Sequence, residues 1–257
     1  MSATRKPNST ETSPLDAGTT TALAAQPLYA QVEAIFIDRI RTGVWRPGQL
    51  IPSEFELARE IGVSQGTVRK ALNALAVDNL VERRQGRGTF VAEHTPDKML
   101  FRFFNLFEDG GGQIEPDSRN SRVSVGRANK DERERLKLDV GAEVIRISRV
   151  RTREGKPLIC ETITLPHHFF PGLVKEKTIP NTLYDHFQKV YGLTVSHGEE
   201  RITAIAAGER EAKALEVVAG LPLVRLDRTM YALNDAPIEW RVSVCALSGA
   251  HYLVRLR

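Results

Sequence analysis

Apolar residues follow two different spacings along the chain. Between residues 27 and 75 they recur every three or four positions, which predicts amphipathic helices, the longest of them from Pro27 to Gly43. From residue 117 onward, short apolar runs alternate with turn sequences, which is typical of antiparallel strands. We therefore predict an α+β protein with a helical N-terminal domain and a C-terminal domain built on an antiparallel sheet.

Two short helices joined by a glycine-containing turn are predicted between residues 53 and 75, the pattern of a helix-turn-helix. Ser53 and Glu56 have the spacing of a capping box, and the helix that they begin is expected to end at Gly62. Ser64 is a good N-cap for the next helix, because its hydroxyl can accept a hydrogen bond from a free backbone N–H. The apolar stripe of that helix consists of Val68, Ala71, Leu72 and Leu75.

The polar face of the helix after Ser64 carries Gln65, Arg69 and Asn73, one helical turn apart. Gln, Arg and Asn side chains can bond to base edges, so this helix could dock in a DNA major groove with its N-terminal residues forward. The alternative is an ordinary amphipathic surface helix. These residues alone favour neither interpretation.

A basic turn after this helix supports DNA binding. Two strand-like stretches, 80–84 and 88–91, flank the turn and predict a β-hairpin, or wing. Arg83, Arg84 and Arg87 lie near its tip, and Glu82 is the only acidic residue beside them. The alternative is a solvated charged turn.

Residues 27 to 92 resemble the GntR family of bacterial transcription regulators. The resemblance rests on motifs in the order and spacing of the family, among them Gly43-Val44-Trp45-Arg46-Pro47-Gly48, Pro52-Ser53-Glu54, Gly62-Val63-Ser64 and Arg84-Gln85-Gly86-Arg87-Gly88-Thr89-Phe90-Val91. It implies a winged helix-turn-helix that binds double-stranded DNA as a homodimer, with Gln65 and Arg69 reading bases. The other implied DNA-binding residues are Ser53, Ser64, Gly66, Thr67, Arg84, Gln85 and Gly86.

Two positions depart from the family pattern. Many members carry arginine where this chain has Gln65, and they often carry arginine where it has Phe55. Gln pairs best with adenine, whereas Arg favours guanine. We therefore expect the operator to differ from the usual family half-site at the base pair that Gln65 meets.

Composition changes twice along the chain and suggests the domain boundaries. Residues 1–26 are rich in Ser, Thr, Pro and Ala without periodicity and are expected to form a disordered tail. The winged helix-turn-helix would occupy 27–92, a linker with three glycines at 110–112 would occupy 93–115, and the second domain 116–257. Phenylalanines between 101 and 107 fit either an early strand of the second domain or a swapped or exposed interface segment.

Two similar hairpins characterise the second domain. The stretches 144–165 and 223–247 each place arginine in the first strand, a turn, and glutamate in the second strand, which suggests a pseudo-repeat in one antiparallel sheet. About residues 115 to 253 resemble the UTRA domain, the effector-binding domain of the HutC subfamily. That resemblance implies a fold similar to chorismate lyase.

Paired arginines are the candidate effector-binding groups. Arg149 and Arg151 alternate along their predicted strand, so both point to one face, and two guanidinium groups suit phosphate or carboxylate. The resemblance implies that they hold an anion with help from Thr182, while Glu239 bonds ligand hydroxyls. The alternative is salt bridging to Glu161 and other carboxylates on a solvated face. The expected effector-binding residues are Arg149, Arg151, Glu161, Thr182 and Glu239.

Charge and cysteine content narrow the functional classes. The 257 residues carry a net charge of +4, which permits a polyanionic partner but is far from a histone-like excess. Cys160 and Cys245 are the only cysteines, which fits a reducing compartment better than a disulfide framework. No apolar run approaches the roughly 20 residues that span a membrane, and no secretory signal is recognisable. We expect a cytoplasmic protein with no membrane association.

Taken together, these patterns predict a transcriptional repressor whose operator binding is modulated by a small anionic metabolite, such as a sugar phosphate or a carboxylate. We expect no enzyme activity, metal or cofactor, because no nucleophile motif or metal-ligand spacing occurs. One alternative is a C-terminal domain with lyase-like activity, in which Arg149 and Glu161 hold a carboxylated substrate. Another is a non-specific, architectural DNA-binding protein.

Overall fold

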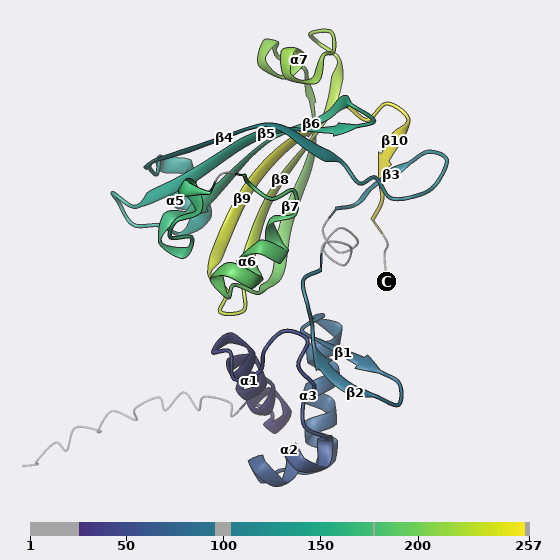
Figure 1. Cartoon of the computed structure of the whole chain (residues 1–257), viewed down its shortest axis with the longest axis vertical. Coiled ribbons are helices and arrows are strands. Elements are labelled where there is room, and N and C mark those ends of the chain that lie inside the picture. The colour runs from purple at the N-terminus through teal and green to yellow at the C-terminus, as the bar shows by residue number, and fades with distance from the viewer. Residues whose placement is uncertain (1–25, 96–103, 177, 255–257) are drawn as a thin grey trace, which may run out of the picture.

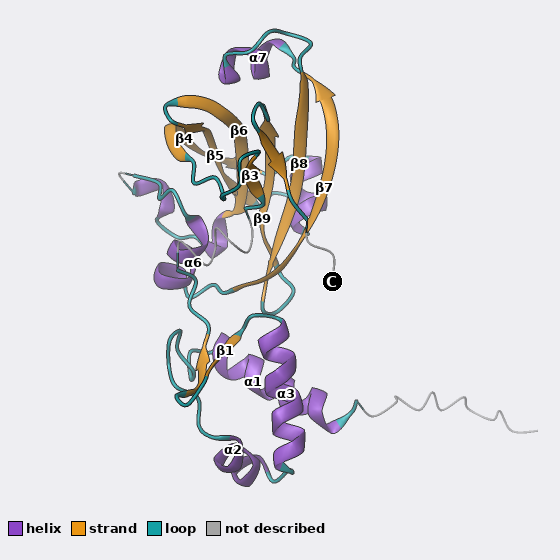
Figure 2. Ribbon diagram, turned by 90° about the vertical axis from the view of Figure 1, so that its right-hand side faces the viewer, coloured by secondary structure: helices purple, strands orange, loops and turns teal. Residues whose placement is uncertain are grey.

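Figure 1 shows the computed structural model of the chain, which describes residues 26–95, 104–176 and 178–254. The predicted disordered tail, residues 1–26, lies outside the described residues except for Gln26. A helical domain occupies one end of the molecule and a sheet domain the other (Figures 1 and 2). No helix of the described residues is long and apolar enough to cross a membrane.

The N-terminal domain is a winged helix-turn-helix, as predicted. Its elements are α1 (Leu28–Arg41), α2 (Glu54–Ile61), α3 (Gln65–Val77), β1 (Val81–Arg84) and β2 (Gly88–Val91). The predicted capping box is present: the amide of Glu56 donates to Oγ of Ser53, and the Glu56 carboxylate accepts from the Ser53 amide. Gly62 ends α2 with a φ of +78°, a left-handed conformation that favours glycine.

One apolar core holds these three helices and the wing together. The predicted stripe of α3 is buried and packs against α1, where Phe36 is fully buried. Trp45, in the turn after α1, is also buried, and its ring centroid lies 5.1 Å from that of Phe36. The core therefore fixes the positions of α3 and the wing relative to α1.

A six-stranded antiparallel sheet forms the C-terminal domain, with the strand order β4-β5-β6-β9-β8-β7. Its elements are β4 (Asp117–Arg127), α5 (Lys130–Leu136), β5 (Glu143–Arg153), β6 (Lys156–Pro166), the 3-10 turns η1 (His167–Phe169) and η2 (Leu173–Lys175), α6 (Leu183–Tyr191), β7 (Val195–Ala206), α7 (Glu209–Leu215), β8 (Pro222–Ala232) and β9 (Pro237–Cys245). The predicted hairpins are β5-β6 and β8-β9. The first extends one residue further at each end than predicted, and the second spans 222–245 instead of 223–247.

The pseudo-repeat extends beyond the two hairpins. Each half of the sheet consists of a strand, a short helix and a hairpin: β4-α5-β5-β6 in the first half and β7-α7-β8-β9 in the second. The helices are exchanged between the halves, because Leu136 of α5 packs near Trp240 of β9, and Leu215 of α7 packs in a cluster with Cys160 of β6. Both helices cover the same face of the sheet, and α6 covers the other.

The predicted linker, 93–115, extends too far. Part of it forms β3 (Leu106–Glu108), which pairs antiparallel with β10 (Ala250–Tyr252) near the end of the chain. Leu106 and Ile114 are buried in a cluster of the C-terminal domain, so this part belongs to that domain. Of the two interpretations of the phenylalanine-rich stretch, the structure supports an early strand, although Phe101 and Phe103 lie outside the described residues.

Candidate functional sites: DNA-binding surface and buried arginine cluster

The first turns of α3 form the centre of the candidate DNA-binding surface. Ser64 caps the helix: its Oγ accepts a hydrogen bond of 3.1 Å from the amide of Thr67 and lies 2.9 Å from the hydroxyl of that residue. Gln65, Gly66 and Arg69 are exposed, while Val68 between them is buried. The apolar stripe and the cap thus direct the predicted base-reading side chains away from the core.

Glu54 connects the three DNA-facing elements, and sequence reasoning missed it. Nε of Arg69 donates to one of its carboxylate oxygens at 2.8 Å, and Nη2 of Arg83 donates to the other at 3.2 Å. The carboxylate belongs to the first turn of α2, whereas the two arginines come from α3 and the wing. A glutamate directly after the capping serine was the available signal, but its partners are 15 and 29 residues away.

The wing presents the basic tip that was predicted. Arg84 is half-buried: its guanidinium lies 4.4 Å from the ring centroid of Phe90 and donates to Glu82. Gln85 and Gly86 are exposed at the tip, and Gly86 has a φ of +69°. Stacking therefore holds Arg84 in place, while the backbone at the tip is free to approach a partner closely.

In the second domain, Arg149 and Arg151 point to the same face of the sheet, as predicted, and α6 covers that face. Both are buried, at 3% and 5% exposure. Glu161, on the neighbouring strand β6, accepts a 2.5 Å hydrogen bond from Nε of Arg149 and lies 3.8 Å from Nη1 of Arg151. The alternative interpretation was right about the salt bridge to Glu161 and wrong about a solvated face.

More charged residues complete this arginine cluster. Arg241 of β9 forms two hydrogen bonds to Glu239 and lies 3.5 Å from Glu161. Tyr184 of α6 donates to Glu239 at 2.8 Å. Arg228 donates to Glu200 at 2.7 Å, and Ser243 donates to Glu161. The sequence did not predict five members of the cluster, although the arginines of the second hairpin were visible in the pseudo-repeat. These five are Arg241, Tyr184, Arg228, Glu200 and Ser243.

The cluster carries more positive than negative charge. Its four guanidinium groups, those of Arg149, Arg151, Arg228 and Arg241, face three carboxylates, those of Glu161, Glu200 and Glu239. Although burial alone would raise the pKa of Glu161, the surrounding arginines hold it well below its ordinary value. Burial also lowers the pKa of Arg151 to about 10. The charge of Asp117, which also acts on Arg151, offsets part of this positive excess.

Backbone carbonyl groups close the cluster on the side of α6. Nη1 of Arg149 donates to the carbonyl of Pro180, and Nη2 of Arg151 donates to the carbonyl of Pro116 and to the side chain of Asn181. Nε of Arg151 is buried and has no hydrogen-bond partner among the described residues. A buried donor of this kind costs free energy until something bonds to it.

Thr182 occupies the N-cap position of α6, but its side chain forms no capping hydrogen bond. Within the described part of the chain its hydroxyl makes no hydrogen bond to Arg149 or Arg151, and Asn181 makes the side-chain contact from this segment instead. The expected residues Arg149, Arg151, Glu161 and Glu239 therefore come together in the structure, whereas Thr182 lies beside them. No group of His, Cys, Asp and Glu residues in the described ranges could hold a metal ion.

Helix α6 also contacts the segment that follows the wing. Oε1 of Gln188 accepts a 2.8 Å hydrogen bond from the amide of His94, three residues after the wing ends. Gln188 is buried and lies one helical turn after Tyr184, which contacts the arginine cluster. In addition, Leu233, in the β8-β9 turn, packs against the core of the winged helix-turn-helix. One short helix thus contacts both the arginine cluster and the segment that follows the wing.

Comparison with known proteins agrees with this architecture. Residues 28–91 match the family model for bacterial regulatory proteins of the gntR family, and residues 112–249 match that of the UTRA domain. The transcriptional repressor NagR of Bacillus subtilis (strain 168) is 28% identical over 234 residues, which are 90% of this chain and 96% of NagR. The histidine utilization repressor of Pseudomonas putida is 32% identical over 208 residues, 80% of this chain and 83% of that protein.

Among solved structures, the ligand-binding domain of a GntR-family regulator from Bordetella bronchiseptica is similar to the C-terminal domain. Its TM-score is 0.55 at 28% identity, and the match covers 61% of this chain and 98% of that domain. The likeness in fold and in sequence therefore extends to the domain that contains the arginine cluster.

Proposed function

Because the chain belongs to the GntR family of bacterial transcription regulators and carries a UTRA effector-binding domain, we propose that it is a repressor that a small anionic metabolite releases from its operator. Proteins of this family are transcription regulators and not enzymes, so the lyase-like alternative is set aside. NagR and the histidine utilization repressor are both named as repressors, which supports the same direction of regulation here.

On DNA, two copies of the chain would place their α3 helices in successive major grooves of a palindromic operator. Gln65 and Arg69 would read bases, since both are exposed at the start of α3. The hydroxyl groups of Ser53, Ser64 and Thr67 would contact phosphates. From the wing, Arg84 and Gln85 would contact phosphates while the backbone of Gly86 enters the minor groove.

The effector would bind in the arginine cluster. Its anionic oxygens would replace the carbonyl groups of Pro116 and Pro180 as acceptors from Arg149 and Arg151, giving stronger charge-assisted hydrogen bonds. The buried Nε of Arg151, which lacks a partner among the described residues, is the observation that carries this assignment. Glu239, which already accepts from Tyr184, would accept hydrogen bonds from ligand hydroxyls.

Coupling to DNA would pass through α6. A ligand that displaces the carbonyl of Pro180 moves the segment that leads into this helix, and Gln188 transmits the movement to the residue that follows the wing. Differential affinity of about 1–3 kcal/mol between the two arrangements would suffice for regulation. The dimer would then present its recognition helices at a spacing that no longer fits the operator.

The test uses the full-length protein in two steps. Selection from random DNA first identifies the operator, and fluorescence anisotropy on that operator then follows release by a panel of sugar phosphates and carboxylates. We expect an enriched palindrome, and at least one anion that both releases the protein and raises its melting temperature. Binding that ignores sequence and collapses with salt would instead indicate a non-specific DNA-binding protein. A palindrome without any releasing anion would contradict only the effector assignment.

A further inference from the structure

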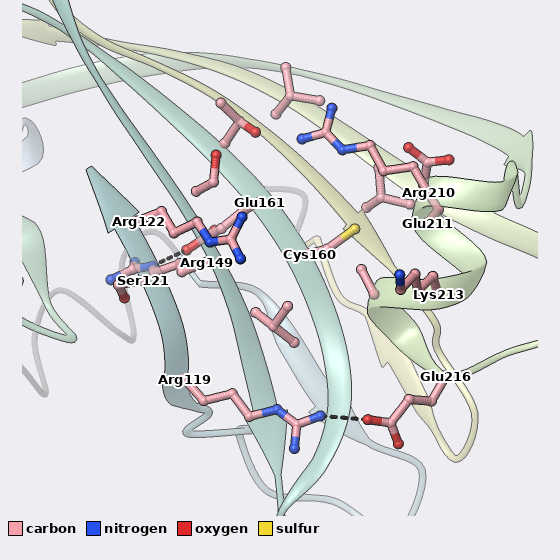
Figure 3. A pocket seen from close by; sticks show the side chains of 16 residues that line it. Arg119, Ser121, Arg122, Arg149, Cys160, Glu161, Arg210, Glu211, Lys213 and Glu216 are labelled. Carbon is pink, nitrogen blue, oxygen red and sulfur yellow. Dashed lines mark hydrogen bonds and ion pairs between the residues drawn. The ribbon is translucent and has the colours of Figure 1, made fainter. Parts of the chain in front are cut away.

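The face of the sheet opposite to the arginine cluster contains an open groove of about 810 Å³ (Figure 3). Side chains alternate between the two faces of a strand, so the neighbours of Arg149 and Glu161 line its floor. The floor residues are Ser148 and Val150 of β5, Cys160 and Thr162 of β6, and Val242 and Val244 of β9. Arg149 and Glu161 of the arginine cluster also contribute to the lining, so the groove and the cluster lie back to back on the shared strands β5 and β6.

Basic side chains line both walls of the groove. Arg119 and Arg122 come from β4, and Arg210 and Lys213 come from α7. Arg119 forms a 2.7 Å ion pair with Glu216 across the groove, and both side chains are exposed. Within the described ranges, Arg122, Arg210 and Lys213 form no ion pair, so three positive charges face the same space. The acidic lining residues are Glu161, Glu211 and Glu216.

The operator does not account for this positive charge. Helix α7 lies at one end of the molecule, and α2 and α3 lie at the opposite end (Figures 1 and 2). Like charges that converge without a partner repel one another, so the arrangement is stabilised when an anion lies between them. The groove is also concave, and its volume lies within the range of about 300–1,000 Å³ that is typical of small-molecule sites.

We propose that this groove is a second ligand site, which binds a small molecule with two or more negatively charged oxygens, such as a phosphate ester or a dicarboxylate. Arg122, Arg210 and Lys213 supply the charge, and Ser148 and Thr162 supply hydroxyl groups on the floor. Arg119 can turn from Glu216 to the ligand at small cost, because an exposed ion pair contributes little. The bound anion would bridge β4 and α7.

Inorganic pyrophosphate is a suitable probe, titrated calorimetrically into the full-length protein at fixed ionic strength. The groove variant combines Arg210→Ala with Lys213→Ala, and its matched control combines Lys130→Ala with Lys156→Ala, which removes two exposed charges elsewhere in the domain. We expect the groove variant to bind at least tenfold more weakly and the control to bind within twofold of the unmodified protein. Equal weakening in both variants, or no weakening in the groove variant, would overturn the proposal.

Two further measurements distinguish binding in this groove from binding in the arginine cluster and from an interface between copies of the chain. Arg241→Lys alters the arginine cluster at a residue that does not line the groove, and it should leave pyrophosphate binding in the groove unchanged. If binding is lost in this variant and kept in the groove variant, the probe occupies the cluster and the proposal is wrong. Sedimentation analysis should give the same oligomeric state for the groove variant and the unmodified protein. A change in that state would show that these cations belong to such an interface, which would also overturn the proposal.

Discussion

Arg69 of α3, the proposed recognition helix, donates a 2.8 Å hydrogen bond from Nε to the carboxylate of Glu54 in α2. This contact favours one orientation of the guanidinium before any DNA is bound, and the hydrogen bond to that carboxylate comes from Nε and not from the Nη groups. Ordering a long side chain in advance lowers the entropy cost of binding. Glu54 therefore acts as a positioning residue for the proposed base contact.

Glu54→Ala should weaken operator binding by about 0.5–1.5 kcal/mol, because Arg69 must then be ordered during binding. Binding to a scrambled duplex should stay the same or tighten, since a negative charge near the phosphates is removed. The ratio of the two affinities, measured by fluorescence anisotropy, should thus fall.

The control for this change is Glu60→Ala, also on α2, whose carboxylate binds Arg39 of α1 at 2.7 Å. It removes the same charge without touching Arg69. If both variants lower the affinity ratio equally, the positioning role of Glu54 is refuted.

Gln65→Arg should shift the preferred base at one position of each half-site from adenine toward guanine. The position is exposed at the first turn of α3, so the longer side chain meets no packing obstacle. Discrimination of about 1–3 kcal/mol at that base pair is expected. Parallel selections from random DNA would measure it. Identical half-sites for the two proteins would exclude a base-reading role for residue 65.

Gln188→Leu should alter regulation more than DNA binding. The substitution removes the acceptor for the amide of His94 and the donor to Thr194, and it replaces the amide by an apolar side chain of similar size. We expect operator affinity without effector to change little, and the coupling between effector and operator to change by about 0.5–2 kcal/mol.

The readout for Gln188 is the effector concentration that gives half-maximal release. Lys189→Ala is the matched control on the same helix, because that lysine is exposed and, among the residues that the structure describes, pairs only with Asp185 one turn away. An unchanged release curve for Gln188→Leu would show that coupling follows another route.

Acid should destabilise the C-terminal domain through Glu161. The pKa of this carboxyl is lower in the folded protein than the value of 4.5 expected when it is unfolded. Its contribution to the free energy of unfolding is therefore complete above about pH 4.5 and is lost progressively as the pH falls below that value. Urea unfolding at pH 7, 4 and 3 should show this loss.

Glu161→Gln should lower the free energy of unfolding at pH 7 by about 3–5 kcal/mol, since it leaves buried arginines without their carboxylate. Its stability should also depend less on pH below 4.5 than that of the unmodified protein. Glu134→Gln is the control, because Glu134 is exposed beside Lys130. Parallel pH profiles for the Glu161 variant and the unmodified protein would contradict the assignment.

The N-terminal domain could be predicted in detail because its signals are local. Caps such as Ser53 and Ser64 lie within three residues of the groups they bond, and the stripe of α3 is visible within four turns. The bridge from Glu54 to Arg69 and Arg83 could not be read in this way. It depends on how α2, α3 and the wing pack together, which no local spacing specifies.

In the C-terminal domain, alternation along one strand predicted that Arg149 and Arg151 share a face. Their burial was not predictable, because it depends on α6 and on the segments around Pro116 and Pro180 that cover them. The contribution of Arg241 depends on the pairing of β6 with β9, strands from different halves of the domain. For the same reason the sequence left β3 as one of two interpretations, since its partner strand lies at the other end of the domain.

The repeat that builds the sheet is broken at one place. Between β6 and β7 the chain inserts η1, η2 and α6, and the second half has no counterpart after β9 among the described residues. Two copies of one unit would form a sheet whose halves are interchangeable, with no preferred side for a ligand and no preferred end for an output. The inserted segment removes that equivalence. Because only the first half carries this segment, a change at the centre of the sheet can move α6 on one side and has no equivalent helix to move on the other.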